Sequence, residues 1–398
     1  MSRRMGLSAM VSMRGEGGGE GASVPRVLHV LGALDRGGIE MWILHLLRKI
    51  PRSDLQQDLL LVGSRRGDLE PLARESGAEV YWIPIQKNRL SFLRRLYFFL
   101  RDTQPDILHA HLHYANSLVL SVARAAGIGV RVAHSHNDTR GKDSRSSLIR
   151  RAYIQGSRLL LRWNSTDKVA ASPVAAECLF PSEDRGNRLR IIECGIDITR
   201  FRRPRGLKWS DVTSRRRLSL GTVGRLVEEK NHSFLLDVFA EVLKARPEAR
   251  LSIVGDGPLK SCLQEKARLL GLSQSVTFWG PRDDICEYLL NEIDIFVFPS
   301  LHEGLGLAVI EAQASGLPCV ISDGVPPEAV IVEGNVRRLP LEASAEKWAE
   351  EILALTREFP IPHEEAYSLV ESSPYNIDNS SSAFLKYYRS LIRRQGVG

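Results

Sequence analysis

The sequence predicts an α/β protein made of two similar units with a ligand cleft between them. The chain has 398 residues, enough for two separate cores. Short apolar runs alternate with helical patterns along most of it, as in parallel sheets. An Arg-rich, aperiodic segment at 201–217 interrupts the alternation, and a new strand pattern begins at Leu218. Ligands gather at the carboxyl ends of parallel strands, so the cleft is expected there.

The first unit is predicted to span residues 25–200. It follows a tail at 1–24 whose composition predicts disorder. Six β-rich runs predict strands at 24–31, 59–62, 80–83, 107–110, 130–133 and 169–172. Helical patterns lie around 42–47 and at 69–76, 92–102, 140–163 and 175–180.

The second unit is predicted to span residues 218–377 and repeats the alternation. Strand patterns recur at 218–223, 251–254, 276–279, 293–298 and 318–322. Helical patterns lie before Leu270 and at 234–244, 285–290, 308–315 and 345–356, and a last helical pattern follows this unit at 382–394.

Composition excludes several classes of protein. The five Cys residues are scattered and form no C-x-x-C pair, which argues against a disulfide framework or a structural zinc site and indicates a reducing cytosol. No apolar run approaches the roughly 18 residues of a membrane span. We therefore expect a cytoplasmic protein, with peripheral binding to the inner face of the membrane as an alternative location.

The net charge of +7 is unevenly distributed. Residues 1–200 hold 30 Lys and Arg against 20 Asp and Glu, whereas residues 201–398 hold 24 against 27. The basic first half predicts an anionic partner, either a membrane surface or a lipid-linked acceptor, although a merely solvated surface would look the same. No nucleic-acid-binding module is recognisable, so nucleic acid is not expected as a partner.

The segment that organises the second unit lies at 291–323 and reads NEIDIFVFPSLHEGLGLAVIEAQASGLPCVISD. It predicts a strand, a Gly-bearing turn, a helix and a strand, and such a turn exposes backbone N–H groups to a phosphate. Glu303 in the turn and Glu311 in the helix are acidic. Beside a nucleotide they must accept hydrogen bonds from neutral groups, for which sugar hydroxyls fit best. The alternative is one carboxylate at a helix dipole and one on a solvated helix face.

Other candidate ligand groups lie where a predicted strand meets a turn. Arg225 and Lys230 follow the strand at 218–223 and are spaced to reach one diphosphate from two sides. Gly37 and Gly38 at a helix start allow close backbone approach. They do not form a G-x-G-x-x-G fingerprint, so NAD is not expected. Three residues of further turns complete the set of candidates: Gly224, Gly255 and Arg282.

Histidines concentrate in the first unit. His109, His111 and His113 come at the end of one strand, and His134 and His136 at the end of another. The first three would share one face only if the strand continued, and the sequence after them looks like a helix start, so a metal site is not favoured. The second pair lies at the sheet edge where ligands bind, where a His can hydrogen-bond a sugar or steer an acceptor.

The stretch FPSLHEGLGLAVIEAQASGLPCV resembles the signature of the retaining glycosyltransferases of family 4, which have the GT-B fold of two facing Rossmann-like domains. The resemblance implies that Glu303 contacts the transferred sugar and Glu311 the ribose of the nucleotide. Contacts to the diphosphate would come from the backbone of the turn residues Gly304, Leu305, Gly306 and Leu307.

Shorter motifs extend the resemblance over residues 25–395. GRLVEEKN at 224–231 resembles the family's diphosphate-binding segment, and GGIE at 37–40 its loop beside the donor phosphates. GPRDD at 280–284 corresponds to the loop that cradles the nucleobase. The family also implies that the last helix, at 378–396, crosses back to the first domain.

Two points of the resemblance concern the first unit more closely. Relatives have a functional His after the strand that corresponds to 130–133, which fits His136 best and His134 second. IIECGID at 191–197 resembles the family's hinge motif but has Glu-Cys in place of Pro-Asn.

Together, these features predict an enzyme that moves a sugar from a nucleotide-linked donor, with UDP or GDP, to an acceptor hydroxyl with retention of configuration. The nucleotide sugar is a co-substrate, and neither a metal nor another cofactor is expected. Arg225 and Lys230 would stabilise the leaving diphosphate. The acceptor would be lipid-linked or a polysaccharide, as in exopolysaccharide, capsule or lipopolysaccharide assembly.

Two alternatives remain open at the level of sequence. A nucleotide-sugar epimerase of the same fold would bind a similar donor without an acceptor. A non-enzymatic protein that binds anionic surfaces would depend on the basic first half alone.

Overall fold

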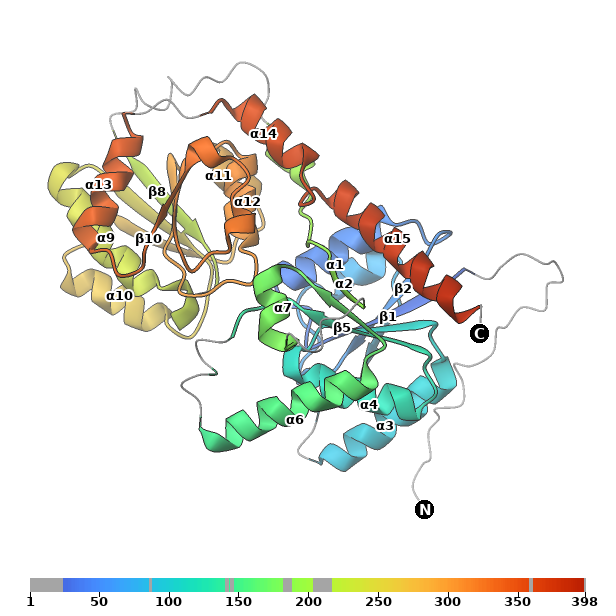
Figure 1. Cartoon of the computed structure of the whole chain (residues 1–398). Coiled ribbons are helices and arrows are strands. Elements are labelled where there is room, and N and C mark those ends of the chain that lie inside the picture. The colour runs from blue at the N-terminus through green and yellow to red at the C-terminus, as the bar shows by residue number, and fades with distance from the viewer. Residues whose placement is uncertain are drawn as a thin grey trace.

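A computed structural model of the chain describes residues 24–85, 88–139, 143, 147–181, 188–202, 217–357 and 361–396. It contains two β-sheets, each covered by helices, in two lobes (Figure 1). Every described strand pair is parallel, so the predicted fold class is confirmed. The predicted tail and most of the predicted linker lie outside the described residues. None of the described helices is long and apolar enough to cross a membrane.

The sheet of the first lobe has seven strands in the order β3-β2-β1-β4-β5-β6-β7. The strands are β1 (Arg26–Leu31), β2 (Gln56–Leu61), β3 (Val80–Trp82), β4 (Ile107–Ala110), β5 (Val130–Ser135), β6 (Asp167–Ala170) and β7 (Leu189–Ile191). The helices are α1 (Gly38–Lys49), α2 (Glu70–Glu75), α3 (Arg89–Thr103), α4 (Asn116–Ala125), α6 (Leu148–Asn164) and α7 (Pro173–Leu179).

Strand β1 shows how alternation along the sequence builds two buried faces of this sheet. Val27 and Leu31 pack into the core formed with α1, whereas Leu28 and Val30 pack into the core formed with α3 and α4. His29 points to the same side as Val27 and Leu31, because successive side chains of a strand alternate between faces. A buried polar ring thus enters an otherwise apolar layer.

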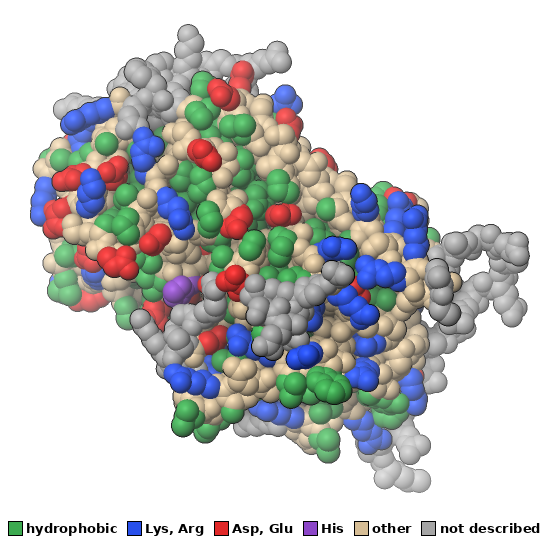
Figure 2. Space-filling view, viewed as in Figure 1, with side chains coloured by type: hydrophobic (Ala, Val, Ile, Leu, Met, Phe, Trp, Pro, Cys, Tyr) green, Lys and Arg blue, Asp and Glu red, His purple; other side chains and the backbone are tan. Residues whose placement is uncertain are grey.

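The sheet of the second lobe has six strands in the order β10-β9-β8-β11-β12-β13. The strands are β8 (Ser219–Val223), β9 (Arg250–Val254), β10 (Val276–Gly280), β11 (Ile295–Phe298), β12 (Cys319–Ser322) and β13 (Val336–Leu339). The helices are α9 (His232–Ala245), α10 (Lys260–Leu269), α11 (Ile285–Asn291), α12 (Leu307–Ala314) and α13 (Ala345–Leu355). On the face shown in Figure 2, the charged side chains of the first lobe are mainly basic and those of the second lobe include many more acidic ones, as the charge distribution predicts.

The chain returns to the first lobe through α14 (His363–Ser372) and α15 (Ile377–Gln395), and Figure 1 shows α15 lying beside α1. Tyr388 of α15 hydrogen-bonds His109 of β4, with 2.7 Å between the hydroxyl oxygen and Nδ1. Near the end of the helix, the Arg394 guanidinium donates to Asp167 of β6 at 3.1 Å. The predicted crossing of the last helix is confirmed.

Three elements were not predicted. Strands β7 and β13 lie at sheet edges, are only three and four residues long, and carry exposed Arg side chains, so neither shows a buried strand pattern. Helix α14 lies inside the stretch that was expected only as a crossover, and α15 begins five residues before the predicted helix.

The expectation that the histidines do not share a face is wrong for His109 and His111. The backbone N–H of His111 donates to Val30 O at 2.9 Å, so strand geometry continues one residue past β4. Only His113 departs, because its φ of +54° is left-handed and turns the chain into the next helix.

Candidate active site

The turn between β11 and α12 is the predicted glycine turn, and its conformation depends on Gly306. This residue has φ +88° at the start of α12, a left-handed conformation that glycine adopts without the steric cost of a Cβ. The turn places Glu303 next to the loop after β8. The backbone N–H of Glu303 donates to Gly324 O at 3.1 Å, which ties the turn to the end of β12.

Lys230 and Glu303 form an ion pair at this edge of the second sheet. Lys230 Nζ donates to Glu303 Oε1 at 2.5 Å, and the Ser300 hydroxyl donates to the same oxygen at 2.6 Å. The ammonium also lies 4.8 Å from the centre of the Phe298 ring, which is a cation–π distance. A cation and a carboxylate predicted from separate segments therefore meet at one point of this sheet edge.

Arg225 is the second predicted cation of this loop. Its side chain is exposed and makes no ion pair with any described residue. Its field reaches Glu40 of α1 in the first lobe, whose pKa is raised to about 7 by burial and by nearby Asp35, while Arg225 opposes that rise. Glu40 belongs to the GGIE motif, but sequence reasoning did not single it out. A carboxyl group that titrates near neutrality beside an unpaired cation is a functional candidate.

Three of the predicted glycines lie where an added Cβ would meet a close neighbour. A Cβ on Gly38 would lie 3.1 Å from Leu307 Cδ1 of the other lobe, and a Cβ on Gly37 would collide with the Glu40 carboxylate. In the second lobe, a Cβ on Gly255 would collide with Gly224 O, and Gly255 has φ +137°. The Gly224–Gly255 contact requires close approach of backbone at the carboxyl ends of β8 and β9, whereas the neighbours of Gly37 and Gly38 are side chains.

The turn residues also contact the first lobe directly. A Cβ on Gly304 would lie within van der Waals overlap of His136 O, and the Ser172 hydroxyl donates to Gly304 O at 2.5 Å. Leu305 is buried in the core shared by the two lobes. The glycine turn is therefore clamped between the ends of β5 and β6 on one side and its own sheet on the other.

Glu311 lies in the second turn of α12 and is partly buried. Burial raises its pKa to about 7, and the Arg200 guanidinium opposes this rise. Near neutral pH such a carboxyl group exists in both protonation states, so it can accept or donate a hydrogen bond.

Arg282 is held within its own loop. Its guanidinium donates to Asp284 and Glu292 and lies 5.2 Å from the centre of the Trp279 ring. These two carboxylates raise its pKa above the ordinary value for arginine. Asp284 precedes α11 but does not cap the helix with its side chain, because its carboxylate accepts from Arg282. The arginine shapes the predicted nucleobase loop, which leaves the backbone of that loop as the candidate ligand contact.

The structure places the rings of His134 and His136 inside the first lobe. Both are buried, and both ring nitrogens of His136 are occupied by hydrogen bonds to His111 and Cys194. Only the backbone carbonyl of His136 reaches the glycine turn. Their predicted catalytic roles remain predictions, and the geometry favours the backbone of His136 over either imidazole ring as the group that acts on the glycine turn.

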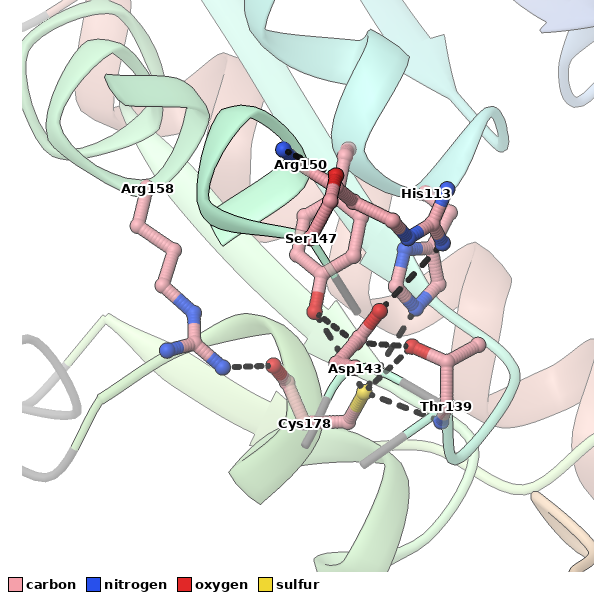
Figure 3. Close-up of polar contacts among 8 residues, drawn as sticks. His113, Thr139, Asp143, Ser147, Arg150, Arg158 and Cys178 are labelled. Carbon is pink, nitrogen blue, oxygen red and sulfur yellow. Dashed lines mark hydrogen bonds and ion pairs between the residues drawn. The ribbon is translucent and has the colours of Figure 1, made fainter. Parts of the chain in front are cut away.

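A second polar cluster of the first lobe escaped sequence reasoning because its members are far apart in the chain (Figure 3). Asp143 accepts hydrogen bonds from Tyr114 and Thr139, both at 2.6 Å, and from Arg150 at 3.3 Å. Burial would raise the pKa of Asp143, but these hydrogen bonds hold it below its ordinary value. Cys178 of α7 accepts from the backbone N–H of Thr139 at 3.2 Å. The cluster fixes the loop after β5 against α6 and α7, and so shapes this wall of the cleft.

Comparison with known proteins identifies the family. The sequence model described as "Glycosyltransferase Family 4" matches residues 36–200, and that described as "Glycosyl transferases group 1" matches residues 217–358. The chain is 35% identical over 340 residues to the "Putative glycosyltransferase EpsF" of Bacillus subtilis (strain 168), which covers 83% of this chain and 88% of that protein. The chain is a glycosyltransferase. Each lobe of this glycosyltransferase corresponds to one of the two matched domains.

More distant proteins agree with this assignment. The capsular polysaccharide biosynthesis glycosyltransferase CapH of Staphylococcus aureus is 23% identical over 92% of this chain and 99% of its own length. The structure of Anabaena HepE in complex with UDP and glucose superposes with a TM-score of 0.76 at 17% identity, covering 92% of this chain and all of HepE. WaaG, a glycosyltransferase of lipopolysaccharide biosynthesis, superposes with a TM-score of 0.72 at 15% identity, covering 91% and 99%. The glycosyltransferase therefore has the predicted GT-B fold, and an epimerase or a non-enzymatic binder is not favoured.

Proposed function

We propose that this glycosyltransferase moves a sugar from a nucleoside-diphosphate donor to an acceptor hydroxyl with retention of configuration and without a metal. The observation that carries the proposal is the meeting of Lys230, Glu303 and the glycine turn at one point of the cleft, with Arg225 exposed nearby. Two cations, free backbone N–H groups and a carboxylate are what a diphosphate joined to a sugar requires.

In this proposal, Arg225 and Lys230 stabilise the negative charge that grows on the leaving diphosphate, which is the role that a metal ion has in other transferases. Glu303 is oriented by Lys230 and Ser300, so it can accept a hydrogen bond from a donor-sugar hydroxyl. Glu311 lies within the field of Arg200, and these two residues are proposed for the ribose. Backbone of 304–307 would meet the diphosphate, and the loop at 280–284 the base.

The acceptor is proposed to bind against the first lobe, between α1, the loop after β5 and α7. The basic charge of this lobe suits an anionic, lipid-linked or polysaccharide acceptor. Glu40 faces the same space and is the carboxyl group of this wall that would titrate near neutral pH. It is proposed to orient the acceptor hydroxyl.

We place the acceptor side of the enzyme on an anionic membrane surface. Helix α6 buries Ile154 and Leu161 and turns its other face outward. On that face the apolar side chains Leu148, Ile149 and Trp163 are 81%, 84% and 67% exposed. The exposed side chains of Arg151 and Arg162 flank them, and Figure 2 shows apolar and basic side chains mixed along the lower edge of this lobe. A helix with both kinds of side chain on its outer face is suited to a lipid headgroup layer.

A panel of nucleotides tests the donor site. UDP, GDP and ADP, with their sugar conjugates, are added to the enzyme in thermal unfolding experiments, with UDP first because the HepE structures contain UDP. One nucleotide at about 100 times its Kd should stabilise the fold by roughly 2.7 kcal/mol. Arg225→Ala should remove most of this stabilisation, whereas Arg246→Ala, on the outer end of α9, should not. Stabilisation by no nucleotide would contradict the proposal.

Product analysis tests the proposed retention of configuration, and an activity assay in EDTA tests the independence of metal. NMR of the product from the matching nucleotide sugar should show the donor's anomeric configuration, and turnover should persist in EDTA. An inverted product, or activity that needs added metal, would refute the corresponding part of the proposal.

Membrane binding is tested by flotation with vesicles that contain anionic lipid. Leu148→Ser with Ile149→Ser should reduce the bound fraction several-fold. Leu269→Ser, at a leucine of α10 in the other lobe that is 70% exposed, is the control. An equal loss of vesicle binding in both variants would show that α6 is not the docking surface.

A further inference from the structure

Five of the ten histidines are buried side by side in the first lobe. They come from β1 and from the carboxyl ends of β4 and β5: His29, His109, His111, His134 and His136. Trp42 of α1 covers them, with ring centres 5.5 Å from His134 and 5.6 Å from His136. Burying five imidazoles is costly unless their nitrogens are paired, so the pairing shows how they are held.

Four of the pairings form one chain across the sheet, which we call the transverse chain. It begins at Gln57 on β2, whose Oε1 lies 3.2 Å from His29 Nε2. His29 Nδ1 lies 3.0 Å from His111 Nε2, and His111 Nδ1 lies 2.8 Å from His136 Nε2. His136 Nδ1 ends the chain 3.6 Å from the Sγ of buried Cys194. The chain thus links β2, β1, β4, β5 and the segment after β7.

The two ends of the transverse chain set its direction. The Gln57 amide nitrogen donates to Leu46 O at 3.4 Å, which leaves its Oε1 as an acceptor for His29. His29 must then carry its proton on Nε2, and the same requirement passes to His111 and His136 in turn. The Cys194 thiol, an S–H donor, completes the chain at His136 Nδ1. Every member is satisfied only when all three rings are neutral and protonated on Nε2.

Burial agrees with neutral rings. It lowers the pKa of His29 to about 4 and that of His136 to about 3, and it holds the pKa of His111 well below the ordinary value for histidine. At neutral pH each of the three rings therefore carries a single proton, so the direction of the hydrogen bonds stays fixed.

The ring geometry does not suit a metal ion, although two triplets of these histidines have donor atoms within 4.8 Å of one another. The rings of His134 and His136 are stacked, with centres 3.7 Å apart. A metal about 2.1 Å from a nitrogen of each would sit about 3.2 Å from both ring centres, which forces an angle of about 70° against about 109° for a tetrahedral ion. In the other triplet, both nitrogens of His109 already bond Tyr388 and His134.

We propose that the transverse chain is a positioning device for the donor site, and that Gln57 and Cys194 fix its direction. The chain locks the ring of His136, and the carbonyl of the same residue presses on Gly304 of the glycine turn. A ring that could flip or change tautomer would let this carbonyl and the turn move together. The inference rests on the proposed function, because the turn matters for catalysis only if it holds the donor.

NMR of the full-length enzyme labelled with ¹⁵N-histidine tests the chain without any assay of activity. Long-range proton–nitrogen spectra distinguish the two neutral tautomers and an imidazolium. His29, His111 and His136, assigned through single His→Gln variants, should all be protonated on Nε2 at pH 7.5. A proton on Nδ1 of His136, or shifts typical of metal-bound imidazole together with a stoichiometric metal content, would overturn the proposal.

Matched variants at the thiol test the positioning role. Cys194→Ala removes the terminal donor and should lower kcat about tenfold while the donor KM changes by less than about twofold. Cys194→Ser keeps a donor and should restore most of the activity and the Nε2 tautomer. Cys319→Ala, an equally buried cysteine of the other lobe, is the control for loss of thiol volume. Equal activity of Cys194→Ala and wild type would overturn the positioning role.

The two proposals fail differently. If wild-type enzyme turns over no nucleotide sugar, the proposed function fails, and the tautomers measured by NMR still decide whether the chain exists. If turnover is normal and His136 carries its proton on Nδ1, the chain fails and the proposed function stands.

Discussion

The two walls of the cleft are built on opposite electrostatic principles. The wall of the second lobe presents charged groups at its surface, with Arg225 exposed and Lys230 paired to Glu303. The wall of the first lobe has neutral imidazoles, buried behind it, that hydrogen-bond one another and their neighbours, and His134 Nε2 is the nitrogen among these five rings that has no partner among the described residues. Charged groups can stabilise charge that develops on a ligand, whereas a buried neutral array can only hold backbone in place. The comparison predicts that damage to one wall changes the chemistry and damage to the other changes its geometry.

The largest effect is expected on the charged wall. Lys230→Ala should lower kcat about 10²- to 10³-fold, because one preorganised contact to the developing charge is lost. Glu303→Gln should cost less, since the amide still accepts a hydrogen bond. The double variant should cost less than the sum of the two, because Lys230 and Glu303 hold each other.

Steady-state rates of sugar transfer measure this cycle. Lys244→Ala on the exposed face of α9, where the lysine pairs with Glu241, is the control and should leave kcat unchanged. Additive effects of the two site variants would mean that the ion pair does not persist when the donor is bound.

The buried histidines of the neutral wall should make the stability of the fold depend on pH. The pKa of His29 is about 4 in the folded protein against about 6.5 unfolded, so between these values the unfolded chain binds more protons. The free energy of unfolding should therefore fall as pH falls from 6.5 to 4, by on the order of 3 kcal/mol from His29 alone. The same sign applies to the other four buried histidines.

Urea unfolding at pH 7.5, 6 and 5 measures this loss, in a range where most carboxylates stay ionised. His29→Gln removes one titrating group and should flatten the profile, whatever it does to stability at pH 7.5. A free energy of unfolding that is constant between pH 7.5 and 5 would show that these rings are not buried and neutral.

The residues of the charged wall could be predicted from the sequence, whereas the contacts of the neutral wall could not, and the reason is physical. Residues of the charged wall lie within short strand–turn–helix segments, so Arg225 and Lys230, or Glu303 and Glu311, could be read from local spacing. The transverse chain joins Gln57 to Cys194 through diagonal neighbours on four strands. Strand order and register decide which residues become neighbours, and neither can be read from one segment.

The fold shows the same division. Central strands with continuous apolar runs were predicted within a few residues, since burial on both faces demands such runs. Edge strands β7 and β13 face solvent and keep Arg side chains, so their pattern resembles that of a loop.

The contact between the two walls can be disrupted by adding one methyl group at Gly304. Gly304→Ala places a Cβ against His136 O, so the glycine turn must shift away from the first lobe. We expect kcat to fall about tenfold or more, because small displacements from a reactive geometry are costly. Gly156→Ala in α6, where nothing lies within 4 Å of the new methyl group, is the control and should be neutral or stabilising by up to about 1 kcal/mol. Wild-type turnover by Gly304→Ala would show that the two walls need not touch during catalysis.

The smallest expected effect concerns Glu311, which combines the features of both walls because it is a carboxyl group in a buried setting. Its pKa of about 7 means that it is mostly neutral at pH 6 and mostly charged at pH 8. If the charged form accepts a hydrogen bond from the ribose, the donor KM of wild type should rise a few-fold as pH falls from 8 to 6. In Glu311→Gln the donor KM should stay at its high value across that range. The variant should therefore differ from wild type at pH 8 and match it at pH 6. The same difference at both values would mean that the carboxyl group does not titrate in the cleft.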